Sequence, residues 1–140
     1  MFLSGCVPSR PERSSAVADL EWRPNISQPI EQLEEILAKV DAQQDKNYTI
    51  SNVAFLHDAK LYIIFQEFVR QLAKHERGVE IAEQHAWLKQ RTQLVESGSA
   101  EYEGGTLASY VAGDIYIDVT KKRIAEIEKR MKATPTKARR

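Results

Sequence analysis

Two helical repeats of apolar residues constrain this chain more than any other feature. The first lies between residues 51 and 75 and places its apolar side chains on one helix face: Leu61, Ile64, Phe65, Phe68, Val69 and Leu72. The second alternates spacings of three and four residues: Tyr110, Gly113, Ile117, Thr120, Ile124, Ile127 and Met131. Such patterns are typical of amphipathic helices that pack at a shallow angle. Because no segment shows the two-residue alternation of a strand, the sequence predicts an all-α protein.

Two further helices complete a small bundle of about four helices. The first helix opens at Pro29 and presents one apolar face: Ile30, Leu33, Ile36, Leu37 and Val40. The polar residues 43–48 are interpreted as a connection to the next helix. A further helix is expected over residues 79–97, with Trp87 and Leu94 on its flank and one buried stripe: Ile81, His85, Leu88 and Val95.

Glycines mark the expected breaks between these helices. Gly78 is expected to interrupt the chain before residues 79–97, because glycine weakens a helix interior. The clearest internal loop runs from Ser97 to Gly105, and the last helix is expected to begin near Thr106, a suitable N-cap. Gly113 lies inside the second repeat, where close approach of another helix would compensate for its cost.

The 140 residues are expected to form one domain with two polar ends. Residues 1–28 are interpreted as a disordered, proline-rich tether, in which Trp22 could dock on the domain. Residues 29–132 are the predicted helical domain, and residues 133–140 a frayed basic tail. No run of residues is apolar enough to predict a transmembrane helix.

The charge of the chain is balanced overall but unevenly placed. The formal net charge is zero, which gives no global attraction to nucleic acid or membrane. Residues 92–120 contain no Lys or Arg, but several acids: Glu96, Glu101, Glu103, Asp114 and Asp118. Residues 121–140 carry nine basic and two acidic side chains. The acidic stretch could face a basic partner, but a solvated loop and helix face is the favoured explanation.

Cys6 is the only cysteine, so no disulfide can form within the chain. It ends the sequence Leu3-Ser4-Gly5-Cys6, which matches the lipobox of bacterial lipoproteins and predicts a lipid on the thiol of the natural form. Only Met1 and Phe2 precede the match, so the apolar core of a signal peptide is missing. Either the start of the sequence is truncated or misassigned, or the match is accidental.

The sequence predicts no catalytic, metal or cofactor site. The three histidines, His57, His75 and His85, lack partners at metal-ligand spacing. No serine lies in a Gly-x-Ser-x-Gly turn, and Gly104-Gly105 lacks the Lys and Ser/Thr of a phosphate-binding loop. Glu101 and Glu103 could act as an acid/base pair only in a cleft, and the sequence does not indicate one. We expect a protein that is not an enzyme.

Gln84, Trp87 and Arg91 share one side of a helix, because they are three and four residues apart. We interpret them as structural. Trp87 would anchor the core, while Gln84 and Arg91 would satisfy buried backbone or acidic groups beside it. Arg91 could pair with Asp58 or with Glu103, and a ligand-binding role is the less favoured alternative.

Several short motifs resemble one family when they are taken in order. They are Ala82-x-Gln84-x-Ala86-Trp87 with Arg91, Tyr102-Glu103-Gly104-Gly105-Thr106, Tyr110-x-Ala112-Gly113 and Thr120-x-x-Arg123. Together they resemble the lysozyme inhibitor LprI family over residues 58–131. The chain departs from that family at Tyr62 and Phe65, where an Asn and a Tyr are usual. It also lacks the family's cysteines, which would fall at Val95 and at Asp114 or Ile115.

The resemblance implies a small helical protein of the bacterial cell envelope, anchored by lipid on Cys6 and facing the periplasm or the exterior. Its implied partner is a basic lysozyme-type hydrolase, not a nucleic acid. The implied contact is an acidic loop consisting of Glu101, Tyr102, Glu103, Gly104 and Gly105. The alternative is a structural or accessory envelope lipoprotein, whose basic tail contacts anionic lipid or cell-wall polymer.

Overall fold

The computed structural model describes residues 25–134 of the chain. Four α-helices follow one another: α1 (Ser27–Lys39), α2 (Gln43–Gln71), α3 (Lys74–Ser99) and α4 (Ala108–Ala133), with a 3₁₀ turn (Ala100–Tyr102) between the last two. Residues 25–134 contain no strand, so the prediction of an all-α protein with about four helices is confirmed. Most of the predicted tether, with Cys6 and Trp22, and the tail from Pro135 lie outside the described residues.

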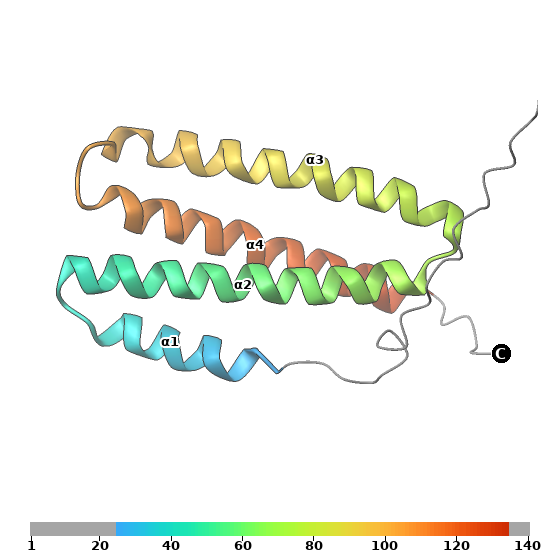
Figure 1. Ribbon diagram of the computed structural model, residues 1–140, viewed down its shortest axis with the longest axis horizontal. Coiled ribbons are helices and arrows are strands. Elements are labelled where there is room, and N and C mark those ends of the chain that lie inside the picture. The colour runs from blue at the N-terminus through green and yellow to red at the C-terminus, as the bar shows by residue number, and fades with distance from the viewer. Residues whose placement is uncertain (1–24, 135–140) are drawn as a thin grey trace, which may run out of the picture.

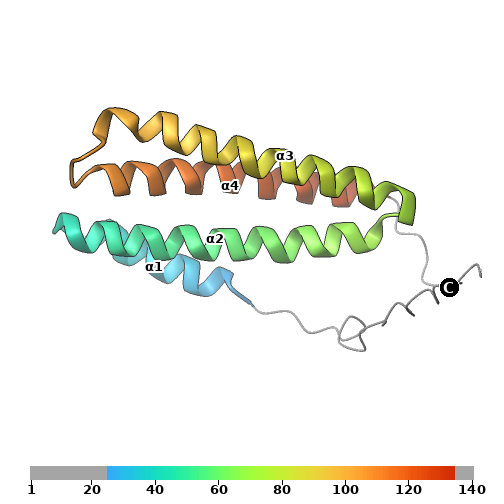
Figure 2. The same ribbon diagram turned by 45° about the horizontal axis from the view of Figure 1, so that its top comes forward.

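The helices run antiparallel to their neighbours in sequence, and α2 and α4 form the central pair (Figure 1). Helix α1 packs on α2, and α3 packs on α4 (Figure 2). Helices α2 and α3 have little contact with each other, although only two residues join them. The α2 and α3 helices therefore leave a groove between them. No helix within residues 25–134 is long and apolar enough to cross a membrane.

The two predicted repeats face each other and form most of the core. At one end of the bundle, α2 and α4 bury one cluster: Leu61, Ile64, Phe68, Leu72, Ile124 and Ile127. At the other end, Ile50 and Val53 meet Ile117, and α1 covers this second cluster with Leu33 and Leu37. A Cβ atom added to Gly113 would lie 3.0 Å from Cγ2 of Ile50. The expected close approach of another helix at this glycine is therefore confirmed.

The expected connection over residues 43–48 is wrong, because α2 begins at Gln43. Its polar first turns are stabilised by their own side chains. The Gln43 side chain donates to Oδ1 of Asn47 at 2.9 Å, and Nδ2 of Asn47 donates to the backbone oxygen of Thr106 at 2.8 Å. The last helix begins at Ala108 and not at Thr106, which lies in the turn before it. The start of α2 was predicted too late, because the prediction was based only on the polar composition of residues 43–48.

Gly78 does not interrupt a helix, because it lies inside α3 and is exposed. The break between α2 and α3 falls at Leu72 and Ala73, both of which have extended backbone. The Glu76 carboxylate accepts a hydrogen bond from the Ala73 backbone nitrogen at 3.0 Å, which satisfies one free donor at the start of α3. Arg77 Nε donates to the backbone oxygen of Leu72 at 3.1 Å and closes the end of α2.

The buried stripe predicted for α3 is also wrong. Ile81 is 53% exposed and Leu88 is 38% exposed, and His85 is exposed beside them, while Val95 is half-buried. The buried residues of α3 are Gln84 and Arg91. Ile81 and Leu88 thus lie on a face of α3 that no described helix covers, while Trp87 packs on the core. The face that contacts α4 is largely polar.

The carboxylate of Glu34 fastens α1 to the central pair. Its Oε1 lies 3.0 Å from Nε2 of the buried His57 on α2 and 3.5 Å from Nζ of Lys121 on α4. Partial burial opposes the charge of Glu34, but the hydrogen bond with His57 and the positive charge of Lys121 outweigh it, so the pKa of Glu34 is lowered. Glu34 therefore contributes stability as a carboxylate.

Replacing Gly78 by Ala should stabilise the protein by about 1 kcal/mol, because alanine favours a helix interior and a Cβ atom there meets nothing within 4 Å. Urea unfolding followed by circular dichroism measures the change. Gly113→Leu is the matched variant, and it should destabilise by about 1–3 kcal/mol, since its side chain must displace Ile50. Destabilisation by Gly78→Ala would contradict the continuous α3 helix.

Glu34→Gln should lower stability at pH 7 by about 0.5 kcal/mol. The folded-state pKa of Glu34 is lowered, so its contribution is present above the unfolded-state pKa of about 4.3. That contribution is lost as the pH falls through the folded-state pKa. The difference between wild type and variant should thus shrink below about pH 4. Glu35→Gln, a change at an exposed neighbour without an ion pair among the described residues, should show no such dependence.

Candidate functional site

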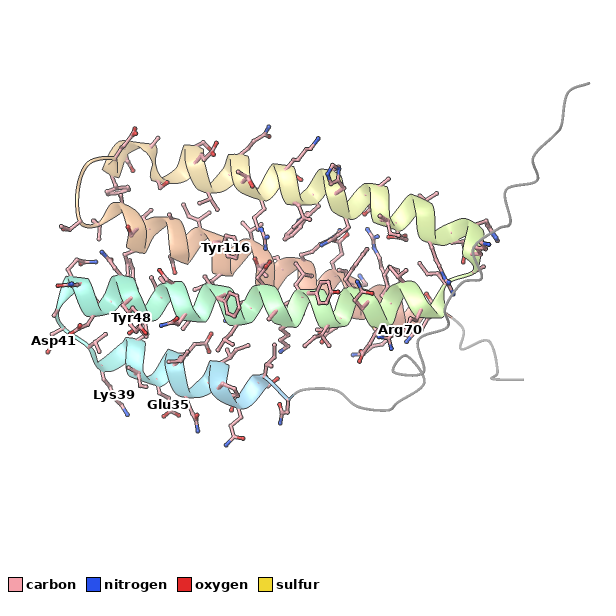
Figure 3. The ribbon with its side chains drawn as sticks, viewed as in Figure 1. Glu35, Lys39, Asp41, Tyr48, Arg70 and Tyr116 are labelled. Atoms are coloured by element: carbon pink, nitrogen blue, oxygen red, sulfur yellow. The ribbon has the colours of Figure 1, made fainter. Side chains whose placement is uncertain are left out.

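The indole ring of Trp87 is the centre of a polar cluster where α3 lies on α4. The guanidinium carbon of Arg91 is 5.0 Å from the ring centroid of Trp87, and that of Arg123 is 5.6 Å from it. Arg91 also lies 4.1 Å from the ring of Tyr116, which Figure 3 labels on α4. Trp87 is half-buried and packs on the larger apolar cluster. Two cations thus contact one aromatic ring at the edge of the core.

Arg91 joins three helices through its Nη1 atom. This atom donates to Oδ1 of Asp58 on α2 at 2.7 Å and to Oγ1 of Thr120 on α4 at 3.0 Å. Of the two acids expected as partners, the structure therefore pairs Arg91 with Asp58 and not with Glu103. Because α2 and α3 share few other contacts, the pair with Asp58 is a principal link between them.

Gln84 is held by Arg123, whose importance the sequence patterns did not reveal. Nε of Arg123 donates to Oε1 of Gln84 at 2.9 Å, and Nη1 donates to Oε2 of Glu126 at 2.9 Å. The Arg123 side chain is buried, and its Nη2 has no hydrogen-bond partner among the described residues. In the sequence, only the Thr120-x-x-Arg123 motif pointed to this residue. Its burial was not predicted, because an arginine is usually exposed.

An ion network extends this cluster toward the end of the bundle that carries the α2–α3 connection. Arg130 donates to Glu80, Glu83 and Glu126 at 3.1, 2.7 and 2.7 Å. Hydrogen bonds from Arg130 and Arg123 lower the pKa values of Glu83 and Glu126 respectively. Burial raises the pKa of Tyr116 to about 12. These shifts all move the pKa values away from neutrality, as expected for structural ion pairs and not for a group that exchanges protons near pH 7.

The predicted partner-binding loop forms a separate feature. It lies at the opposite end of the bundle, about 12 Å beyond Arg91 along the axis of α3. Glu101, Glu103, Gly104 and Gly105 are exposed, and Tyr102 is half-buried. The structure therefore does not bring this loop together with Gln84, Trp87 and Arg91.

Backbone hydrogen bonds give the loop a defined shape. The Glu103 nitrogen donates to the Ala100 oxygen at 3.2 Å, and the Gly105 nitrogen donates to the Tyr102 oxygen at 3.1 Å. Gly104 has a φ of 82°, a conformation that favours glycine. Asn47 on α2 fixes the following residue through the Thr106 oxygen. The acidic side chains thus project from an ordered turn.

The described residues do not form a metal site. No three His, Cys, Asp or Glu side chains within residues 25–134 lie close enough together to hold an ion. His57 is engaged with Glu34, and His75 and His85 are exposed. A groove of about 340 Å³ lies between α2 and α3, with mostly apolar walls that include Tyr62, Phe65 and Leu88.

Replacing Arg91 by Met should destabilise the protein by about 2–3 kcal/mol, because it removes hydrogen bonds to Asp58 and Thr120 and the contact with Trp87. Arg91→Lys should lose less, since it keeps the charge but not the planar fork. Urea unfolding measures both variants. Lys89→Met on the exposed face of α3 is the matched control. An effect of Arg91→Met below about 0.5 kcal/mol would contradict the structural role of this residue.

Comparisons with protein-family models, with curated proteins and with solved structures gave no match for this chain. The likeness to the LprI family therefore stays a prediction from the motifs.

Proposed function

We propose that this protein is a non-enzymatic lipoprotein of the bacterial cell envelope, which binds a basic lysozyme-type hydrolase through the turn between α3 and α4. The observation that carries the proposal is the exposure of Glu101 and Glu103 on an ordered turn that has no neighbouring cation in sequence. Within residues 25–134, neither carboxylate forms an ion pair. Both are therefore free to meet the cations of a partner.

Charge and shape of the turn both favour binding to a basic surface. Glu96 and Asp114 are exposed on the two helices that the turn connects, and they add to its negative potential. A concentrated acidic surface accelerates encounter with a basic protein and orients it. Since the turn is fixed by its own backbone hydrogen bonds and by Asn47, little conformational freedom would be lost on binding.

Tyr102 gives the turn an aromatic group between its two acids. The half-buried ring is partly held by the bundle, and its remaining surface is available for contact. Aromatic residues of this kind often contribute much of the binding energy of an interface, because they bury a large area with few rotatable bonds. The neighbouring carboxylates would then provide selectivity for a cationic partner.

The membrane attachment in this proposal rests on Cys6, which lies outside the described residues. A lipid on that thiol would place the helical domain beside a membrane without a membrane-spanning helix. The alternative, an accessory envelope lipoprotein acting through its basic tail, depends on residues 133–140, which are outside the described residues from Pro135 onward. The exposed carboxylates on an ordered turn favour the first function.

Glu101→Lys combined with Glu103→Lys should weaken binding to a basic lysozyme at least about tenfold, because attraction becomes repulsion at two positions. Calorimetric titration measures the affinity, and a cell-lysis assay measures inhibition. The control variant, Glu31→Lys with Glu35→Lys, makes the same change of charge at exposed positions of α1 and should retain binding.

Equal loss of affinity in both variants would assign the effect to net charge and would contradict a role for the turn. Failure of the wild-type protein to bind any basic lysozyme would contradict the proposed function itself. Circular dichroism should show the same helix content for all three proteins, because each substituted residue is exposed.

A further inference from the structure

Helices α2 and α3 carry two rows of uncharged residues beside their groove, which we call the outer seams. Each row alternates spacings of four and three residues. The α2 seam consists of Tyr48, Asn52, Phe55, Ala59, Tyr62 and Gln66. The α3 seam consists of Ile81, His85, Leu88, Thr92 and Val95. Neither contains Asp, Glu, Lys or Arg, although these residues make up 29% of the chain.

The large side chains of the outer seams are exposed to an extent that a solvated helix face does not explain. Tyr48, Phe55 and Tyr62 are 74%, 72% and 65% exposed. They follow one another at intervals of seven residues, as do Ile81 and Leu88 on α3. Tyr62, Ile81 and Leu88 line the groove itself. Heptad spacing of exposed apolar residues on two adjacent helices is the pattern that another helix covers.

We infer that the outer seams pair with the outer seams of a second copy of this chain about a two-fold axis, with the two α2 helices antiparallel. Each α2 then lies along the α2 of the other copy, beside its α2–α3 groove. This surface is separate from the acidic turn, and the inference does not depend on the proposed function.

The residue types of the α2 seam favour a copy of itself. Its positions alternate between an aromatic ring and a small or amide side chain: Tyr48, Asn52, Phe55, Ala59, Tyr62 and Gln66. A two-fold axis perpendicular to α2 reverses the direction of the copy. The rings and the small or amide side chains occupy the two alternating positions of the heptad. When two such helices pack antiparallel, the first kind of position on one helix faces the second kind on the other. Each ring would therefore lie opposite a small or amide side chain, as interdigitated packing requires.

The neutral charge of the outer seams supports the same occupant. In a two-fold interface each patch meets its own copy, so a patch with net charge would repel itself. An uncharged patch has no such cost. A strongly charged partner, in contrast, would find no complementary charge on either seam.

No other helix within residues 25–134 covers the outer seams. Helix α1 packs on α2 and has no contact with α3. Three of the six residues 135–140 are basic, and none has a large apolar side chain. A helix with heptad apolar spacing is available from a second copy.

The size of the face is adequate for a stable dimer. The α2 seam, residues 48–66, extends about 27 Å, because a helix rises about 1.5 Å per residue. Two adjacent helices are about 20 Å wide, which gives a flat footprint of roughly 540 Å². Projecting side chains increase the accessible area above that footprint. Stable interfaces bury about 800 Å² per partner, so the outer seams are close to the required size.

Sedimentation velocity of the full chain tests the pairing. The protein concentration is varied between about 1 and 100 µM, a range that covers the Kd of most protein dimers. The wild-type protein should then form a species of about twice the 16.0 kDa of one chain. Phe55→Glu with Tyr62→Glu should reduce the mass to that of one chain at every concentration. Ile36→Glu, at an exposed apolar residue of α1, is the control and should remain dimeric. A monomeric wild type, or a dimeric Phe55→Glu/Tyr62→Glu variant, would overturn the inference.

Cross-linking tests the antiparallel arrangement. In a Cys6→Ser background, Ala59→Cys should be joined between copies by a short bis-maleimide, because Ala59 lies near the two-fold axis. Tyr48→Cys should not, since the two copies of residue 48 would be about 30 Å apart. Cross-linking at both positions would indicate parallel helices, and cross-linking at neither would indicate another surface. Either result would overturn the pairing, while a folded circular dichroism spectrum verifies each variant.

Discussion

The attachment of α3 by polar contacts is the constraint on which the rest of this structure depends. Most of the core lies between α2 and α4, whose apolar faces are matched. Helix α3 contributes Trp87 to that core. Its other attachments include the hydrogen bonds of Arg91, the bond between Gln84 and Arg123, and the ion pairs of Arg130 with two glutamates of α3. Because buried hydrogen bonds of charged groups are strongly directional, they fix the rotation of α3 about its axis. That rotation leaves the apolar residues of α3 facing solvent beside the groove, and it places the acidic turn at the end of the bundle.

The fold was predictable from the sequence where burial follows apolar periodicity. The repeats of α2 and α4 identified the central pair, and Gly113 indicated the close approach at Ile50. The same reasoning failed for α3, because its buried positions are Gln84 and Arg91 and its apolar positions are exposed. Helix boundaries also failed where local hydrogen bonds decide them, as at Gln43 and Ala73. Composition does not record which polar side chains can satisfy a helix end.

The candidate site was predictable in its parts and not in its arrangement. The sequence identified the acidic turn and the Trp87 face, but only the fold shows that they lie far apart. Arg123 could not be identified as buried, since its burial depends on Gln84, which lies 39 residues away in the chain. The outer seams were hidden for a related reason. Ile81 and Leu88 of the α3 seam were assigned to the core, because a single sequence gives no indication of which faces a bundle leaves uncovered.

The contacts of Glu34 with His57 and Lys121 attach α1 to the central pair of helices, and they decide what happens when the chain is pulled from its N-terminal side. Any tension applied through the residues that precede Ser27 is transmitted first to α1, the shortest of the four helices. This helix contacts α2, and its removal would leave the α2–α4 cluster of Leu61, Ile64 and Ile127 in place. Loss of α1 would expose the cluster of Ile50, Val53 and Ile117, because Leu33 and Leu37 cover it, while the larger cluster between α2 and α4 would stay buried.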